Sequence, residues 1–400
     1  MESVRKNGDK GILYTYFILS IIGIIMIYSA SMISAYNGAL TNGISISDKH
    51  FVIRQSLYFM IGSFIVVLMS NSFNIDIFKK KNIQQLILFG VLLLLLVTLL
   101  FGSEINGSKN WLNLGIFSIQ SSELLKISSI LYLSYILDRR LKNERSYNLK
   151  SLIPPLLLLG LGILLILVQG DLGGALLNAG IIAFMLLYSD IKNKIKLQIL
   201  TITATPLFIY ILYTLIFDTS NIYRLKRIKV LTAPFKYENG DGYQLSNSLL
   251  AIGNGGIFGK GLGNGIMKLG YLPEPHTDFI FAVIAEELGL IGVLIIIFMY
   301  GFLTFKAIIY ANKTNNNFYK MICIGISSYI ILQVFINLAG ISGLIPLTGV
   351  TLPLLSYGGS SFLSISFAIG ILLSCSKNIK NEKNNGYTCT NPRMVVTPQS

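Results

Sequence analysis

Runs of about twenty apolar residues recur from one end of this 400-residue chain to the other. Each run is long enough to cross the hydrocarbon core of a bilayer as an α-helix, at a rise of about 1.5 Å per residue. The composition agrees, because 53% of the residues are hydrophobic and only 12% are charged. The chain is therefore predicted to be an all-α polytopic membrane protein and not a soluble domain.

Ten such runs predict one ten-span membrane domain over residues 1–375, followed by a cytoplasmic tail over 376–400 that we expect to be disordered. The first run is too long for a signal peptide and is expected to be retained. A long extracellular loop, 218–278, separates the seventh span from the eighth. The predicted spans are 12–34, 53–71, 84–102, 118–137, 151–169, 174–190, 197–217, 279–309, 319–342 and 350–374.

Lysine and arginine in the short loops predict the orientation, since cytoplasmic loops of membrane proteins are enriched in both. The basic clusters after the second, fourth and sixth spans and in the tail all fall on one side. That side, with both termini, is therefore expected to be cytoplasmic. The residues are Lys79, Lys80, Lys81, Arg139, Arg140, Lys142, Arg145, Lys192, Lys194, Lys196, Lys377, Lys380 and Lys383.

The outer loop 218–278 breaks this pattern, because it carries Arg224, Lys226, Arg227 and Lys229 within six residues. A long loop can be translocated whatever its charge. A basic cluster beside the outer leaflet also suits a ligand that bears phosphate, and both readings stay open. The glycines further along the loop follow no strand and precede no Walker lysine-serine pair, so a nucleotide site is not expected. Glycine instead allows tight turns and close approach to a ligand or another helix.

The segment 271–289, YLPEPHTDFIFAVIAEELG, holds four of the eighteen acidic residues at the entrance of the eighth span. Ionisable groups at such a place are candidates for function, because charge is costly in lipid. Its prolines suit a helix entrance, so the helix is expected to begin near His276 with Asp278 in its first turn. There the helix dipole favours an ionised carboxylate, which could act as a general base or merely cap the helix. Glu286 is expected on a similar face, deeper in the membrane.

Other polar residues map to the same outer side. Glu123 and Lys126, three apart on the fourth span, can form an ion pair that fixes packing or can meet an anionic headgroup. Trp111 suits an interfacial anchor, and Asp171 suits either a helix cap or a cavity group. The turn containing Ser356 and Ser360 could bind a sugar, close a gate or pack helices. Together these residues predict a polar cavity open to the outer leaflet.

These segments together resemble the SEDS family of shape, elongation, division and sporulation proteins, which includes FtsW, RodA and SpoVE. The chain departs from the family pattern at Ser121, where Pro is common, and in QGDLGG at 169–174, where QPDLGT is usual. The resemblance rests on Tyr28-Ser29-Ala30-Ser31, NGSKNWLNLG, Ser122-Glu123 with Lys126, Gln169 with Asp171-Leu172-Gly173, Tyr223-Arg224 with Arg227, GYLPEPHTDFIFAVIAEELG and PLTGVTLPLLSYGGSS.

The resemblance implies a peptidoglycan glycosyltransferase that polymerises lipid II at the outer face of the bacterial cytoplasmic membrane, with a class B penicillin-binding protein as partner. It implies that Asp278 is the essential aspartate. From their places near it in the sequence, His276 and Glu286 are expected to have supporting roles. Glu123, Lys126 and Trp111 match further family motifs. No cofactor is implied, although a divalent cation is compatible, and no nucleic acid partner is expected. The long first outer loop and the NGSKNWLNLG segment favour an FtsW-type division protein over a RodA-type elongation protein.

Two other functions are compatible with the same residues. A lipid II flippase would also need many spans and a polar cavity, but it would need polar access from both leaflets, and the candidate residues cluster on the outer side. A non-catalytic scaffold that recruits the transpeptidase could use the long outer segments as a partner surface. Polymerisation, translocation and partner binding are separate assays that distinguish the three.

Overall fold

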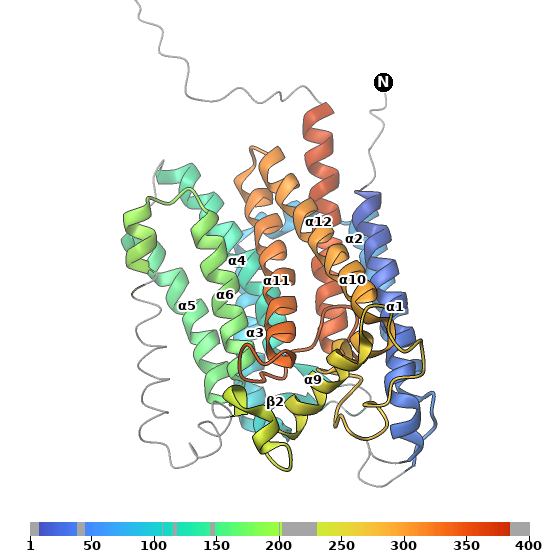
Figure 1. Cartoon of the computed structure of the whole chain (residues 1–400). Coiled ribbons are helices and arrows are strands. Elements are labelled where there is room, and N and C mark those ends of the chain that lie inside the picture. The colour runs from blue at the N-terminus through green and yellow to red at the C-terminus, as the bar shows by residue number, and fades with distance from the viewer. Residues whose placement is uncertain are drawn as a thin grey trace, which may run out of the picture.

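The computed structural model describes residues 8–37, 45–105, 107–113, 115, 118–144, 149–199, 201 and 230–384, and it is a bundle of long helices (Figure 1). The basic loop residues Arg224 and Arg227 lie outside these ranges. The longer helices are α1 (Lys10–Tyr36), α2 (His50–Asn71), α3 (Lys81–Phe101), α4 (Ser121–Glu144), α5 (Leu149–Val168), α6 (Leu172–Tyr188), α9 (Tyr243–Gly255), α10 (Ile280–Lys313), α11 (Asn317–Ile341) and α12 (Gly359–Asn384), and the 3-10 turns are η1 (Ile75–Lys79) and η2 (Pro234–Tyr237).

Seven of the described helices are long and apolar enough to cross a membrane, namely α1, α2, α3, α5, α10, α11 and α12. Helix α6 is apolar but has only 17 residues. The expected seventh span, 197–217, lies mostly outside the described residues. The polytopic helical class is confirmed, and the count of ten spans stays a prediction.

Helices α4, α11 and α12 form the interior of the bundle and are mostly buried. Helix α4 packs against α3, α6 and α11, while α12 packs against α2. Because α4 is enclosed by other helices, it can carry Glu123 and Lys126 without exposing them to lipid. Helices α3 and α5 instead present a row of exposed apolar side chains, such as Leu86, Leu93 and Leu157, as expected for a surface that faces lipid.

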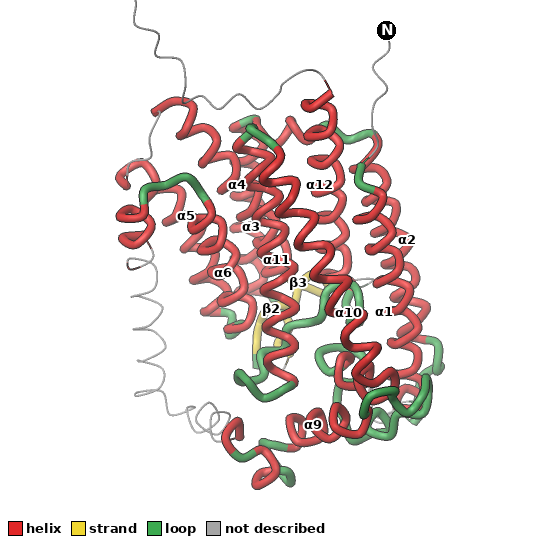
Figure 2. The backbone as a smooth tube through the Cα atoms, turned by 45° about the horizontal axis from the view of Figure 1, so that its top comes forward, coloured by secondary structure: helices red, strands yellow, loops and turns green. Residues whose placement is uncertain are grey.

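The beginning of α1 and the end of α12 lie at the same end of the bundle (Figure 1). The opposite end carries α9, the connection from α9 to α10, and a small sheet (Figures 1 and 2). The arrangement agrees with the predicted topology in which the described chain starts and ends on one side. The end with α9 is called the α9 end below.

The small sheet is a departure from the all-α prediction. Strands β1 (Ser103–Ile105), β2 (Ser108–Asn113) and β3 (Ser118–Gln120) pair antiparallel in the order β1-β2-β3. The predicted spans 84–102 and 118–137 left 103–117 as a connection, and residues 118–120, which were expected to begin a span, form β3 instead. The sheet joins α3 to α4, and Lys109 N donates to Gln169 O between α5 and α6 at 2.8 Å.

Helix α10 is broken near its start. Gly289 has φ +64° and ψ −167°, a backbone conformation that is open essentially to glycine alone. A Cβ at this position would lie 2.3 Å from Gly259 N in the glycine-rich connection. Residues 280–288 therefore form a separate short helical segment that precedes the apolar run beginning with Leu290. The glycines let the backbone at this break lie close to the glycine-rich connection.

The last helix differs from the predicted span 350–374 at both ends. Residues 350–358 are not helical, and Leu354 has φ +64°, while Pro353 lacks an amide hydrogen for a helix. Helix α12 begins at Gly359 and continues to Asn384, so the first nine residues of the expected tail are helical. The remainder of the tail, 385–400, lies outside the described residues.

Candidate active site

Asp278 lies in the turn that precedes α10, at the α9 end of the bundle. The expected helix start near His276 was wrong, because the helix begins at Ile280. The reason is tertiary: three backbone carbonyls that a helix would use internally are taken by other elements. The O atom of His276 accepts from Tyr357 N at 2.9 Å, that of Thr277 from Ser356 Oγ at 2.7 Å, and that of Asp278 from Asn337 Nδ2 at 2.9 Å.

The Asp278 carboxyl lies against the backbone of the segment before α12. A Cβ at Gly349, where φ is +70°, would lie 3.5 Å from Asp278 Oδ2, so this glycine lets the chain come close. Asp278 as a whole residue is only partly exposed, and protein surrounds most of it. Burial raises the pKa of Asp278 to about 7, and the nearby Glu274 carboxylate adds to the rise. This desolvation opposes the ionisation that a helix dipole was expected to favour.

His276 is buried in an aromatic cluster two residues before Asp278. Its ring centroid lies 4.4 Å from that of Phe51 and 5.4 Å from that of Tyr357. Burial lowers the pKa of His276 to about 4, so the imidazole is neutral at neutral pH. Its Nδ1 is buried without a hydrogen-bond partner in the described part of the chain. His276 thus packs the turn beside Asp278 and contributes no positive charge to it.

Both predicted serines of the last turn hydrogen-bond to backbone. Ser356 Oγ donates to Thr277 O and accepts from Leu352 N at 2.7 Å each. Ser360 Oγ donates to Ser118 O at 2.9 Å and accepts from Gln120 N at 3.1 Å. Of the three roles considered for this segment, the contacts favour packing, because each hydroxyl joins two parts of the chain.

Glu123 and Lys126 form an ion pair inside the bundle. Lys126 Nζ lies 2.7 Å from Glu123 Oε1 and 3.0 Å from Gln333 Oε1, and the lysine is only 2% exposed. Tyr329 OH donates to the other oxygen of Glu123 at 3.2 Å, and the ammonium lies 4.7 Å from the Tyr329 ring centroid. The pair therefore joins α4 to α11, and its ammonium faces protein and not a headgroup in this structure.

Asp171 caps α6 and also collects donors from three other elements. Its Oδ1 accepts from Gly174 N at 2.7 Å, which is the expected capping bond. Its Oδ2 accepts from Asn110 Nδ2 in β2 at 3.2 Å, Gln120 Nε2 in β3 at 3.3 Å and Ser122 Oγ in α4 at 3.1 Å. This carboxylate therefore fixes the small sheet to two helices. Trp111, in β2, pairs with Gln120 and is partly exposed.

Glu286 binds the glycine-rich connection. Among the described residues, no hydrogen bond joins it to Asp278. Its carboxylate accepts from Ile266 N at 3.0 Å and Met267 N at 3.1 Å, and Lys260 Nζ lies 3.4 Å away. The neighbouring Glu287 binds the same connection through Lys268 Nζ at 2.6 Å. The supporting role of Glu286 is thus to hold the loop that packs on the 280–288 segment.

Sequence reasoning missed three buried polar residues that the structure brings into these networks: Lys268, Gln333 and Asn337. Lys268 is 1% exposed and pairs with Glu287 and Ser29. A usable signal existed for the other two, because Gln333 and Asn337 stand four apart in the otherwise apolar stretch IILQVFINLAG of α11. Polar residues at that spacing share one helix face.

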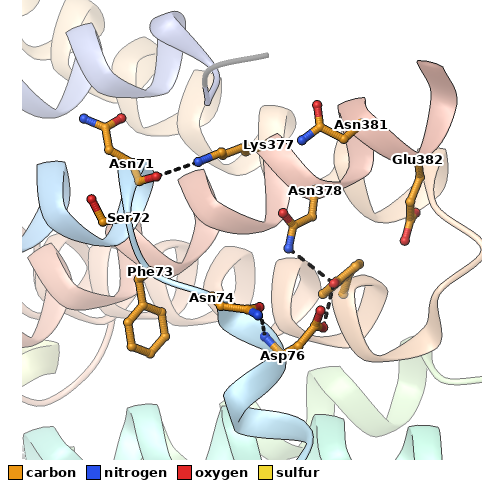
Figure 3. Close-up of a pocket in the computed structure, with 10 residues that line it drawn as sticks. Asn71, Ser72, Phe73, Asn74, Asp76, Lys377, Asn378, Asn381 and Glu382 are labelled. Carbon is orange, nitrogen blue, oxygen red and sulfur yellow. Dashed lines mark hydrogen bonds between the residues drawn. The ribbon is translucent and has the colours of Figure 1, made fainter. Parts of the chain in front are cut away.

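A pocket at the other end of the bundle contains none of the predicted site residues (Figure 3). Its groups already bind one another: Lys377 Nζ donates to Asn71 O at 2.7 Å, and Tyr319 OH donates to Asp76 Oδ1 at 2.7 Å. It lies beside the C-terminal part of α12, at the end of the bundle away from Asp278, and is not the candidate active site. It is lined by Asn71, Ser72, Phe73, Asn74, Asp76, Tyr319, Lys377, Asn378, Asn381 and Glu382.

Comparison with known proteins agrees with the motifs. The sequence model of the FtsW, RodA and SpoVE family, described as "Cell cycle protein", matches residues 10–381. The protein named probable peptidoglycan glycosyltransferase FtsW of Bacillus subtilis (strain 168) is 38% identical over 387 residues, covering 96% of this chain and 94% of that protein. Its namesake from Enterococcus hirae is 38% identical over 388 residues, covering 95% of each.

Solved structures share the fold. Thermus thermophilus RodA superposes with a TM-score of 0.62 at 25% identity, covering 93% of this chain and 97% of RodA. A chain from a structure described as "Structural coordination of polymerization and crosslinking by a peptidoglycan synthase complex" has a TM-score of 0.71 at 24% identity, covering 93% and 98%. The resemblance predicted from the motifs is confirmed: this chain belongs to the FtsW/RodA/SpoVE family.

Proposed function

We propose that this chain is a peptidoglycan glycosyltransferase of cell division, which polymerises lipid II at the outer face of the cytoplasmic membrane with Asp278 as general base. The relatives named FtsW support both the activity and the division role. The observation that carries the proposal is the place of Asp278, a partly exposed residue whose turn is held at the α9 end of the bundle by α11 and by the segment before α12. A base with a pKa near the working pH is the most effective one.

The reaction needs one base. The 4-hydroxyl of the acceptor GlcNAc gives its proton to the Asp278 carboxylate as its oxygen bonds to the anomeric carbon of the donor MurNAc, with inversion. The bond from that carbon to the diphosphate oxygen breaks, and undecaprenyl diphosphate leaves with the electron pair. Because the diphosphate leaves without a proton, no general acid is required.

The departing diphosphate builds negative charge, and fixed cations at such a group commonly supply a large part of catalysis. We assign this role to Arg224 and Arg227 of the outer loop, which lie outside the described residues. Lys126 is not assigned to it, since its ammonium is buried between Glu123 and Gln333. Its contribution is to the packing of α4 on α11.

The proposed partner is a class B penicillin-binding protein, which would cross-link the strands that this chain makes. A fold neighbour taken from a complex of polymerisation and crosslinking supports such a partnership. The proposed place is the cytoplasmic membrane, with both termini inside. The positive clusters near the ends of α2, α4, α6 and α12 support this orientation, and it puts Asp278 on the outer side.

The test is lipid II polymerisation by the purified full-length protein together with its transpeptidase partner. Asp278→Ala and Asp278→Asn should lower the rate by about 100-fold to 10,000-fold, the usual contribution of a general base. Asp190→Asn is the matched control, because Asp190 is an exposed carboxylate that pairs only at the surface with Lys320, at 3.1 Å.

Polymer formation by Asp278→Ala at the wild-type rate would refute the assignment of the base. Translocation of lipid II in vesicles without polymer would instead establish a flippase. Recruitment of a fluorescent fusion to the sidewall and not to the septum would assign the protein to elongation.

A further inference from the structure

Two buried amides stand one turn apart on α11 and face the segments that form the candidate active site. Gln333 is fully buried and Asn337 is 3% exposed. Both are four residues apart in a helix, so their side chains emerge on the same face. Neither belongs to the motifs that identified the family from the sequence.

Asn337 joins two segments that are distant in sequence. Its Nδ2 donates to Asp278 O at 2.9 Å and to Val350 O at 2.8 Å. Both acceptors are carbonyl oxygens, so the amide must present its nitrogen to them, and the orientation of the side chain is fixed by its partners. Asn337 therefore ties Asp278 to Val350. The backbone of the preceding residue, Gly349, lies against the Asp278 carboxyl.

Gln333 repeats the arrangement one turn away. Its Nε2 donates to Thr351 O at 2.9 Å, and its Oε1 accepts from Lys126 Nζ at 3.0 Å. The neighbouring carbonyls of Val350 and Thr351 therefore accept hydrogen bonds from two side-chain amides that stand one turn apart on α11. Lys126 is in turn held by Glu123, so the buried ion pair of α4 is connected to the backbone beside Asp278.

We infer that Asn337 is a positioning residue for Asp278, which sets the place of its carboxyl by clamping the 278 and 350 backbones together, with Gln333 and the Lys126–Glu123 pair as the support of that clamp. The inference rests on the proposed role of Asp278. Asn337 Oδ1 has no hydrogen-bond partner in the described part of the chain, so the structure uses this side chain through its nitrogen alone. A shift of about 1 Å in a reacting group can cost roughly 100-fold in rate.

The experiment compares Asn337→Ala and Asn337→Leu with the wild type in lipid II polymerisation by the full chain and its partner. Leucine has a similar branched shape, so it fills the site and keeps the variant folded if alanine does not. Both variants should lower kcat by roughly 10-fold to 100-fold while KM for lipid II stays within about twofold, because the substrate contacts remain and only the reacting group moves.

The pH profile separates positioning from a general loss of stability. Release of the clamp should admit water to the carboxyl, so the acid limb of the rate should move from about pH 7 toward the ordinary aspartate range. Glu274 and the neutral His276 remain in place in both variants. Gln84→Ala is the matched control, since Gln84 in α3 is also fully buried and binds one backbone carbonyl, Phe78 O, at 2.6 Å. It should change neither kcat nor the acid limb.

An unchanged kcat and acid limb in Asn337→Leu would overturn the inference. If Asp278→Ala is inactive in the same assay, the proposed function survives that result and only the positioning role fails. If Asp278→Ala polymerises normally, the proposed function fails first, and the inference fails with it.

Discussion

Asp278 shows how one residue type takes its properties from its surroundings. Placed in a first helical turn, its carboxylate would have been stabilised by the helix dipole, as the sequence predicted. In the structure it lies in the turn before α10, beside Gly349, where burial raises its pKa to about 7. The carboxyl is thus close to half ionised at neutral pH, which suits a group that must accept a proton and then release it.

The pH dependence of polymerisation follows directly. The base form of Asp278 is the deprotonated one, so the rate should rise as pH increases through about 7 and then level off. Steady-state polymerisation measured from about pH 5.5 to 8.5 tests this. An acid limb near pH 4, the range of an ordinary aspartate, would contradict the burial seen here.

Stability should respond to the same group with the opposite sign. The folded-state pKa of about 7 is above the ordinary aspartate value of 3.8, so the folded state is favoured by protonation. That stability is fully present below about pH 3.8 and is lost as pH rises to about 7. Asp278→Asn removes the penalty and should therefore stabilise the protein at pH 8, by at most about 4 kcal/mol at about 1.4 kcal/mol per pKa unit.

Thermal unfolding in detergent at about pH 8 and pH 4 measures this difference. The variant should unfold at a higher temperature than the wild type at pH 8 and at the same temperature at pH 4. An inactive but more stable variant is the expected signature of a residue retained for function. Equal unfolding temperatures at pH 8 would show that the carboxyl is well solvated.

At the scale of elements, α10 is two helices with different tasks. The segment 280–288 carries Asp278 at its entrance and the glutamates Glu286 and Glu287 at its end, while the run after Gly289 is the apolar span. Glu286 binds the glycine-rich connection through backbone amides. Glu287 binds it through Lys268 and also accepts a hydrogen bond from Ser29 of α1. Glu287, for which the sequence suggested no role, therefore helps to fix the glycine-rich connection to α10.

Lys268→Met should destabilise the protein strongly, by about 3–5 kcal/mol, because it leaves the carboxylate of Glu287 buried without its cation. The double variant Lys268→Met with Glu287→Gln removes both charges and should recover most of that loss. Lys320→Met breaks an exposed pair and should cost less than about 1 kcal/mol. Thermal or denaturant unfolding of the three variants makes the comparison. A double variant as unstable as Lys268→Met would refute the stabilising role of the Lys268–Glu287 pair.

At the scale of the whole molecule, apolar side chains face outward and polar networks lie inside the bundle. Exposed apolar side chains of α3 and α5 lie on the outside, whereas two ion pairs (Glu123–Lys126 and Lys268–Glu287), the two amides of α11 and the capping aspartate are buried. A connected set of hydrogen bonds runs from Gln333 through the 350–351 backbone to Asn337 and Asp278. Such a network is tolerated inside the bundle because its donors are largely satisfied by protein and kept from lipid.

Much of this organisation was predictable. The apolar runs predicted the described spans, and the ordered motifs predicted the family and its peptidoglycan glycosyltransferase activity, which the relatives confirm. Asp278 was selected because it is an acid at a span entrance. The sheet at 103–120, the break at Gly289 and the helical conformation of residues 375–384 were not predicted. Each depends on contacts with distant parts of the chain, which local patterns do not contain.

The sequence by itself determined that this chain is a membrane-embedded helical bundle, because the transfer of an apolar run into lipid depends on the side chains of that run. Its ordered motifs also determined the family. Only the tertiary structure decided which buried charges and carbonyls meet. Lys268 finds Glu287 and a serine 239 residues away, and Asn337 finds the Asp278 carbonyl across 59 residues. These partners are chosen by how the helices pack, and that packing also sets the protonation of Asp278.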